Sequence, residues 1–314
     1  MSVIEVRDLR KTYGSTVAVD RLSLDVADGE VVGVLGPNGS GKTTTVECIA
    51  GLRRPDAGSV RVDGLDPVAD RRAVTTFVGV QLQQAGLQAK LTAREALELY
   101  ASFYDEPADG LALAERLGIG DKLGTRYDNL SGGQKQRLAV ALALIGRPRV
   151  ALLDELTTGL DPRSRRGVWE VVEEARADGT TIILVTHFME EAQHLCDRLV
   201  LISEGRIVAE GTPREIIGQT GAPTTMSFTP SSPVPHEVFA AIDGVSDVRS
   251  REGDRVELNL TDSAVLEVLE HLRTRGVRPN RLRVEDSTLD DAFLDLTAEP
   301  ANIDSLDHTE AEVS

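Results

Sequence analysis

Hydrophobic residues in the first 219 positions follow two alternating patterns. The segments VVGVLG, VALLDE and TIILVTH contain nearly continuous apolar runs, which are typical of parallel strands covered on both faces. Residues 43–52, 91–104 and 164–179 have the spacing of helices instead. Alternation of such strands and helices predicts an α/β fold built on a parallel sheet.

The pattern changes near Thr220, where Gly, Thr, Ser and Pro dominate, so we place a domain boundary there. Beyond it, the segments TTMSFT, VSDVRS, RVELNL and RLRVED are patterned as strands, with two helical stretches interleaved. Val265, Val268, Leu269 and Leu272 form the clearer helical stripe, which Gly276 ends. The order β-α-β-β-α-β predicts a small α+β unit of the ferredoxin-like kind.

A last helix is expected in STLDDAFLDLT. Ser287 and Asp290 have the spacing of a capping box, and Leu289, Phe293 and Leu296 form its buried side. The predicted organisation is therefore a domain at 1–219, with a helical subdomain at about 84–147, then an accessory α+β domain at 224–297. Residues 298–314 are polar and acidic and are expected to be a disordered tail.

Charge and composition narrow the possible functions. The formal net charge is −17, and ten acidic residues but no Lys or Arg follow Val284, which argues against a nucleic-acid-binding protein. Cys48 and Cys196 are the only cysteines, so no disulfide framework is possible and a reducing compartment is expected. The N-terminus does not resemble a signal peptide, and no apolar run reaches the roughly 18 residues of a membrane span. We expect a chain that is soluble by itself.

A glycine-rich loop follows the first apolar strand and matches G-x-x-x-x-G-K-[ST]. Its backbone N–H groups and the start of the next helix favour a bound phosphate, while Lys42 can reach the terminal phosphates and Thr43 can ligate Mg²⁺. This pattern predicts a nucleoside triphosphate site rather than a plain glycine turn. Its expected ATP-binding residues are Gly36, Pro37, Asn38, Gly39, Ser40, Gly41, Lys42, Thr43 and Thr44.

Two adjacent acidic residues end the VALLDE strand. Asp154 is placed to hold Mg²⁺, and Glu155 is suited to orient or deprotonate an attacking water. An apolar run that ends in two acids is a weak signal alone, but it becomes a strong one beside a phosphate-binding loop.

The segment NLSGGQKQRLAVALAL is the most specific stretch of the chain. With the preceding motifs it resembles the ATP-binding cassette (ABC) ATPases, whose signature LSGGQ includes Ser131, Gly132, Gly133 and Gln134 here. The alternative, an N-capping Ser with two turn glycines, would be the default for SGG alone. The resemblance covers residues 1–219 and implies a P-loop NTPase core with a helical subdomain.

Further residues match family motifs in the expected order. The resemblance implies that Gln83 is the Q-loop glutamine and a metal ligand with Thr43 and Asp154, although Gln81 or Gln84 could take that place. It implies that His187 is the switch histidine, Asp161 the D-loop aspartate and Tyr13 the aromatic residue that stacks on adenine. Leu156 stands where the family usually has proline, which leaves that turn less fixed. His194 near Cys196 is expected to be an ordinary helix residue rather than a metal ligand.

The resemblance also implies partners and a function. In this family the signature loop of one subunit completes the ATP site of another, so we expect a homodimer that sandwiches ATP and Mg²⁺. The segments THFMEEAQHLCDRLVLISEGRIVAEGTP and LDDAFLDLT are similar to ATP-binding subunits of the daunorubicin-resistance type. Export of a drug, antibiotic or other hydrophobic compound is then expected, through a separate integral membrane permease, with the chain peripheral on the cytoplasmic side. An importer subunit or a non-transport ABC ATPase is the alternative.

Overall fold

A six-stranded sheet forms the centre of the first domain in the computed structural model, which describes residues 2–82, 86–219, 224–251 and 254–297. Its strand order is β5-β6-β7-β3-β8-β9. Every neighbouring pair is parallel except β8 and β9, as the apolar runs predict. The strands are β3 (Val31–Leu35), β5 (Val78–Gln81), β6 (Val150–Asp154), β7 (Thr181–Val185), β8 (Arg198–Ser203) and β9 (Arg206–Gly211).

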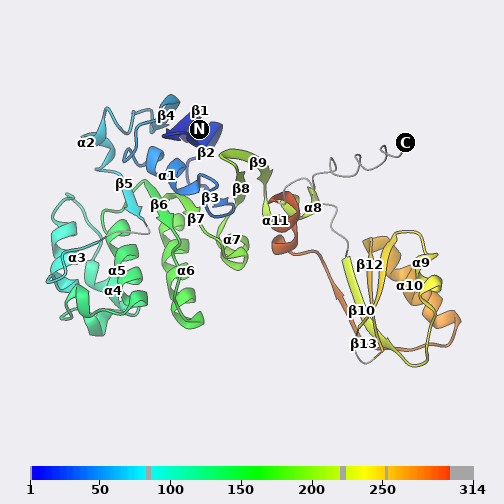
Figure 1. Cartoon of the computed structure of the whole chain (residues 1–314). Coiled ribbons are helices and arrows are strands. Elements are labelled where there is room, and N and C mark those ends of the chain that lie inside the picture. Colours follow the sequence, from blue (N-terminus) through cyan, green and yellow to red (C-terminus); the bar gives the residue numbers. More distant parts are fainter. Residues whose placement is uncertain (1, 83–85, 220–223, 252–253, 298–314) are drawn as a thin grey trace, which may run out of the picture.

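A second, antiparallel sheet has the order β2-β1-β4 and lies beside helix α1 (Figure 1). Its side chains share one apolar cluster with α1 and with one face of the central sheet. Helix α1 therefore packs against both sheets, and this packing holds the glycine-rich loop that precedes the helix. The elements are β1 (Ser2–Tyr13), β2 (Thr16–Ala27), α1 (Lys42–Ile49), β4 (Ala57–Val62) and α2 (Arg71–Val74).

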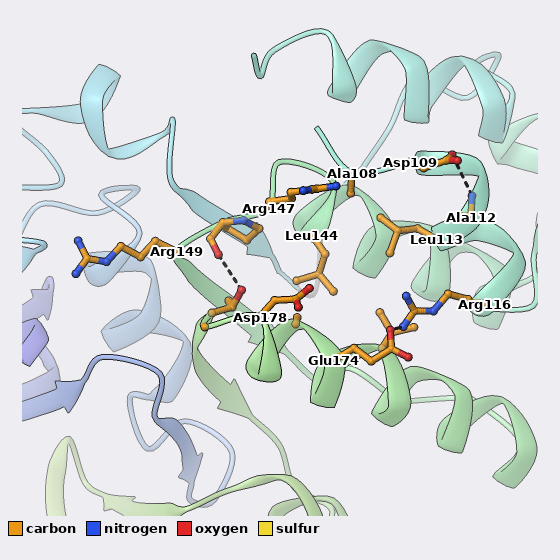
Figure 2. A pocket seen from close by; sticks show the side chains of 15 residues that line it. Ala108, Asp109, Ala112, Leu113, Arg116, Leu144, Arg147, Arg149, Glu174 and Asp178 are labelled. Atoms are coloured by element: carbon orange, nitrogen blue, oxygen red, sulfur yellow. Dashed lines mark hydrogen bonds and ion pairs between the residues drawn. The ribbon is translucent and has the colours of Figure 1, made fainter. Parts of the chain in front are cut away.

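The helical subdomain contains α3 (Ala93–Ala101), α4 (Gly110–Arg116) and α5 (Gly132–Leu144), with short 3₁₀ turns at Gly120–Lys122 and Tyr127–Asn129. Thr92 and Glu95 form a capping box at the start of α3, and Asp109 caps α4. Where α4 approaches α6 (Pro162–Ala177), Arg116 and Glu174 form an ion pair beside a cavity of about 690 Å³ (Figure 2). None of the predicted ATP-site residues lines this cavity.

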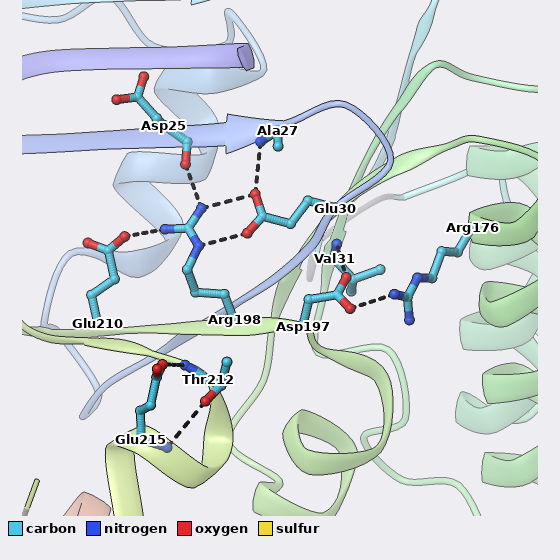
Figure 3. A network of polar contacts seen from close by, with 10 residues as sticks. All are labelled: Asp25, Ala27, Glu30, Val31, Arg176, Asp197, Arg198, Glu210, Thr212 and Glu215. Carbon is cyan, nitrogen blue, oxygen red and sulfur yellow. Dashed lines mark hydrogen bonds and ion pairs between the residues drawn. The ribbon is translucent and has the colours of Figure 1, made fainter. Parts of the chain in front are cut away.

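Arg198 on strand β8 binds the segment Asp25–Glu30, which precedes β3 (Figure 3). Its guanidinium donates to both carboxylate oxygens of Glu30, at 2.7 and 3.0 Å, and to the carbonyl of Asp25 at 2.6 Å. It also pairs with Glu210 on β9. Next to it, Asp197 accepts a hydrogen bond from the Val31 backbone N–H at 3.0 Å. These contacts hold the strand that precedes the glycine-rich loop.

The C-terminal sheet has the order β11-β12-β10-β13 with antiparallel neighbours, which confirms the ferredoxin-like fold. Phe228 and Phe239 lie in its core, with their ring centroids 5.8 Å apart. The elements are β10 (Thr224–Pro230), α9 (His236–Ala240), β11 (Val245–Arg251), β12 (Arg255–Leu260), α10 (Asp262–Thr274) and β13 (Pro279–Glu285).

The last helix, α11 (Leu289–Thr297), does not pack on this sheet. It returns to the first domain and contacts α7 (Met189–Leu195) and α8 (Pro213–Gln219), and Leu289 joins the apolar core there (Figure 1). The accessory domain predicted at 224–297 includes this helix, whereas its contacts are with the first domain. Its capping box is also shifted by one residue, because Thr288 and Asp291, rather than Ser287 and Asp290, exchange the two bonds. The tail predicted at 298–314 lies outside the described residues.

Candidate nucleotide site

The predicted site residues converge because they follow neighbouring parallel strands. The glycine-rich loop follows β3, His187 follows β7, and Asp154 and Glu155 stand at the end of β6. Since β6, β7 and β3 are adjacent and parallel, their carboxyl ends share one edge of the sheet. Ligands of open α/β sheets bind at this edge.

Glycines in the loop are required by close contacts as well as by conformation. A Cβ on Gly36 would lie 2.1 Å from the Ile202 carbonyl oxygen, and one on Gly41 would lie 2.3 Å from that of Ala18. Gly39 has open space around it but adopts a φ of 81°, which favours glycine. Pro37 and Asn38 are exposed, whereas the Ser40 side chain is buried. Gly41 caps α1, so the first N–H groups of that helix face the loop and suit an anion.

Lys42 closes over the loop that precedes it. Its ammonium donates to the carbonyl oxygens of Gly36 at 2.7 Å and Pro37 at 2.8 Å. Burial lowers the pKa of Lys42, and the charges of Asp154 and Glu155 act in the opposite direction. A bound phosphate would oppose the effect of burial and would compete with the two carbonyls for the ammonium.

Asp154 is well suited to hold a divalent cation with Thr43. Its carboxyl is buried, with a relative exposure of 2%, and its Oδ2 has no hydrogen-bond partner. Burial, followed by the charge of Glu155, raises its pKa to about 6, while a hydrogen bond with the Thr43 side chain lowers it. A buried, unpartnered carboxylate oxygen beside a hydroxyl is the type of oxygen donor set that Mg²⁺ prefers. These two residues therefore fit the predicted metal site.

We expect Asp154→Asn to stabilise the nucleotide-free protein at pH 8 but not at pH 4. The folded pKa of about 6 lies above the ordinary 3.8, so the fold favours the protonated carboxyl, and ionising it weakens the fold as pH rises between those values. At 1.36 kcal/mol for each pKa unit, the gain at pH 8 is at most about 3 kcal/mol. Chemical denaturation at both pH values measures it. An equal effect at pH 4 and pH 8 would contradict the prediction.

Glu155 and His187 face each other at the edge of the site. His187 Nδ1 lies 3.5 Å from Glu155 Oε1, and the His187 ring stacks on Phe188 with centroids 4.1 Å apart. Glu155 adopts a φ of 52°, a costly conformation for a non-glycine residue that is typical of functional sites. Leu156, in the place of the usual proline, is fully buried in the core, so packing fixes the position after Glu155.

Gln83 lies outside the described residues, so its predicted role stays a prediction. Gln81, one of its alternatives, is buried at the end of β5, and its Oε1 accepts a hydrogen bond from the Asp154 backbone N–H at 3.1 Å. Its Nε2 has no partner. Gln81 therefore supports the strand that carries Asp154.

The signature segment begins α5. The Ser131 hydroxyl accepts a hydrogen bond from the Gln134 N–H at 3.3 Å, and the Gln134 side chain accepts one from the Ser131 N–H at 2.9 Å. Both residues thus form a capping box in the single chain. A Cβ on Gly133 would lie 2.9 Å from Leu160, but one on Gly132 would meet nothing within 4 Å. Contacts within this chain therefore give no reason for glycine at position 132.

Asp161 and Tyr13, the remaining predicted residues, stand at the ends of elements. Asp161 caps α6 by accepting hydrogen bonds from the backbone N–H groups of Arg163 and Ser164. The pKa of Asp161 is lowered, mainly by the hydrogen bond that its carboxylate accepts from the Ser164 hydroxyl. Tyr13 ends β1 with 42% of its surface exposed. Lys11 and Arg53 lie 5.7 and 5.8 Å from its ring centroid, so an aromatic base and its phosphates would meet both a ring and two cations there.

Two residues that support Glu155 and its turn belong to none of the predicted motifs. Gln136 donates from Nε2 to the Glu155 carbonyl at 2.9 Å, and the buried Glu191 accepts from Thr157 just beyond Glu155. A polar residue among the apolar positions of α5 is a weak signal for the first. For Glu191 the sequence shows two consecutive glutamates, Glu190 and Glu191, and nothing in it indicates which of them is buried.

The fold and the site together define a P-loop ATPase. A family model described as ABC transporter matches residues 19–158. The chain is 36% identical over 302 residues to the Nod factor export ATP-binding protein I of Rhizobium etli, with 95% of this chain and 94% of that protein covered. It is 35% identical over 309 residues to the daunorubicin resistance ATP-binding protein DrrA3 of Streptomyces coeruleorubidus, with 96% and 98% covered.

A solved structure supports the same assignment. The dimeric post-hydrolysis state of the ATP-binding cassette MJ0796 with ADP and Pi has a TM-score of 0.61 and 28% identity, and covers 67% of this chain and 98% of its own. The chain belongs to the ABC transporter family, among the daunorubicin-resistance-type ATP-binding subunits. It is an ATPase subunit of an ATP-driven transporter.

Proposed function

We propose that this subunit powers export of a drug, antibiotic or other hydrophobic compound through a separate membrane permease. The observation that carries this proposal is the extent of the match to two export-related proteins. The alignments cover 95% and 96% of the chain and therefore reach beyond the ATPase domain into the C-terminal one. An importer or a non-transport ABC ATPase is the alternative, and the names of these relatives favour export.

Within the site, each residue has a proposed role. The P-loop residues Gly36–Thr44, with Lys42 among them, hold the phosphates of ATP, and Tyr13 stacks on adenine. Thr43 and Asp154, with Gln83, hold Mg²⁺, which would neutralise phosphate charge when bound. Glu155 orients or deprotonates the attacking water, and His187, whose Nδ1 lies 3.5 Å from Glu155 Oε1, would act beside it as the switch histidine.

Hydrolysis requires a second copy of the chain in this proposal. Gly132 is exposed and unobstructed at the start of α5, in the helical subdomain, while the P-loop lies at the edge of the central sheet (Figure 1). Ser131, Gly132, Gly133 and Gln134 of one copy would cover the ATP held by the P-loop of the other. Asp161 lies at the same interface. ATP then joins the subunits and its hydrolysis releases them.

A membrane partner is proposed to dock on α3. None of the helices in the described part of the chain combines the length and apolar character that a bilayer crossing demands. Phe103, just after α3, has 65% of its surface exposed, and Leu99 on α3 is exposed as well. Exposed apolar residues close together favour a protein contact. The subunit would thus lie at the cytoplasmic face of the membrane. Its net charge of −17 does not favour a nucleic-acid partner.

We expect Phe103→Glu to abolish co-purification with the permease and permease-stimulated ATP hydrolysis, because it places a charge in the apolar contact. ATP binding by the isolated chain should not change. Leu266→Glu, at an equally exposed leucine on α10, is the matched control and should retain both properties. A polytopic membrane protein encoded beside this chain, where one is found, is the candidate permease to co-express. Stimulation of the chain's ATP hydrolysis by candidate drugs would identify compounds to test for export. Stimulation that survives Phe103→Glu would contradict the proposed docking surface.

A further inference from the structure

Glu191 on α7 is a fully buried carboxyl group outside the nucleotide site. Its Oε1 accepts hydrogen bonds from the Thr157 hydroxyl at 2.9 Å and from the Trp169 indole N–H at 3.1 Å, while its Oε2 has no partner. A buried polar atom without a hydrogen bond is costly, and an apolar side chain could fill the same space. The two bonds to Oε1 therefore need an explanation beyond filling the core.

The three bonded residues belong to segments that carry the proposed catalytic residues. Thr157 lies two positions after Glu155 and four before Asp161, and Glu191 lies four positions after His187. Trp169 lies in the middle of α6, which Asp161 caps. One carboxyl group thus connects the Glu155–Asp161 segment to the helix that follows His187.

Glu155 is a residue that needs such support. Its φ of 52° is unfavourable and persists only where the neighbouring residues fix it. On its N-terminal side, the Glu155 backbone N–H donates to the Val185 carbonyl at 2.8 Å. Beyond it, Thr157 is fully buried, and its hydroxyl donates a hydrogen bond to Glu191 Oε1 at 2.9 Å. The turn is therefore held to β7 and to α7, on either side of His187, and to α5 through Gln136, which donates to the Glu155 carbonyl.

Attachment of α7 to α6 does not depend on Glu191 alone. Arg165 on α6 pairs with Glu190 at 3.2 Å and lies 4.9 Å from the Phe188 ring centroid. His194 stacks on Trp169 with centroids 4.6 Å apart. Since these contacts already join the two helices, the specific effect of Glu191 is on Thr157.

We propose that Glu191 is a positioning residue for ATP hydrolysis, which holds Thr157 so that Glu155 and His187 keep their relative placement. It touches neither nucleotide nor water. Loss of its bond to Thr157 should let the Glu155 turn shift, and small displacements of a catalytic group reduce the rate strongly. Nucleotide binding by the P-loop should be unaffected, because no bond of Glu191 reaches that loop.

The test compares four variants of the full-length chain by steady-state ATP hydrolysis, ATP binding and thermal unfolding. Glu191→Met and Thr157→Val each remove the bond and should lower kcat by about tenfold or more, with KM and the Kd for ATP changed less than twofold. Glu191→Gln keeps an acceptor oxygen and should retain most of the wild-type kcat. Trp169→Phe removes only the other bond and should lower Tm with little effect on kcat.

The expected pattern separates positioning from simple stability. The proposal is overturned if Thr157→Val keeps the wild-type kcat, or if kcat follows Tm in all four variants, Trp169→Phe included. If Glu191→Met does not fold, Thr157→Val alone decides. The inference rests on the role proposed for Glu155, so Glu155→Gln is measured in parallel. Full activity of that variant would refute the Glu155 role itself, whatever the result at Glu191.

Discussion

Glu155→Gln should reduce ATP hydrolysis by about 10²–10⁴-fold, the usual contribution of a general base, while ATP still binds. The substitution keeps the size of the side chain and its place at the end of β6 but removes the group that accepts a proton from water. With hydrolysis blocked, the ATP that joins two copies should persist. The variant should therefore elute as a dimer in the presence of ATP, whereas the wild type returns to monomers as ATP is consumed.

Size-exclusion chromatography with Mg²⁺ and ATP, alongside a phosphate-release assay, measures both effects. Glu190→Gln is the matched control, because the Glu190 side chain is exposed and pairs with Arg165 rather than with a residue of the nucleotide site. It should behave as the wild type does. A Glu155→Gln protein that stays monomeric with ATP, while the wild type turns over, would contradict the assignment.

Gly132→Glu and Lys42→Ala should each abolish ATP hydrolysis when the variant protein is assayed alone. A mixture of the two variant proteins should regain hydrolysis. Gly132 has open space for a side chain, so the first variant should fold and should still bind ATP at its P-loop. In a mixed dimer, the intact P-loop of the Gly132→Glu chain faces the intact signature of the Lys42→Ala chain. One complete site results, although neither chain contains one.

Phosphate release by the equimolar mixture, against each protein alone, is the measurement. A chain that carries both substitutions serves as the control partner, because mixing it with Lys42→Ala leaves every site defective. The two motifs do not act across an interface if the mixture of Gly132→Glu and Lys42→Ala chains regains no hydrolysis. The same conclusion follows if the mixture that contains the doubly substituted chain regains hydrolysis as well.

Much of the site was predictable because its residues form contiguous motifs at the ends of strong apolar strands. Gly36–Thr44, Asp154 and Glu155 needed only the order of strands and helices to be placed at one edge of a sheet. The ferredoxin-like domain was predictable for a similar reason. Its four strands show clear apolar patterns, and the order of strands and helices limits how they connect.

Other features depended on contacts that spacing does not encode. Ser287 and Thr288 each have an acidic residue three positions later, so the sequence could not decide which forms the capping box. The apolar stripe of α11 would suit packing on either domain, and only the structure places Leu289 in the ATPase core. The bond between Glu191 and Thr157 joins residues 34 positions apart, without any motif linking them.

Cysteines introduced at Asn38 and Gly132 provide the most direct measurement of the shared ATP site. Both positions are exposed, and the native Cys48 and Cys196 are buried, so background reaction should be low. An Asn38→Cys chain and a Gly132→Cys chain are mixed with a short bifunctional crosslinker that reacts with thiols. They should form a covalent dimer only when ATP is present. If the two chains never join with ATP, even with the membrane partner bound, the proposed sandwich of two copies around the nucleotide is wrong.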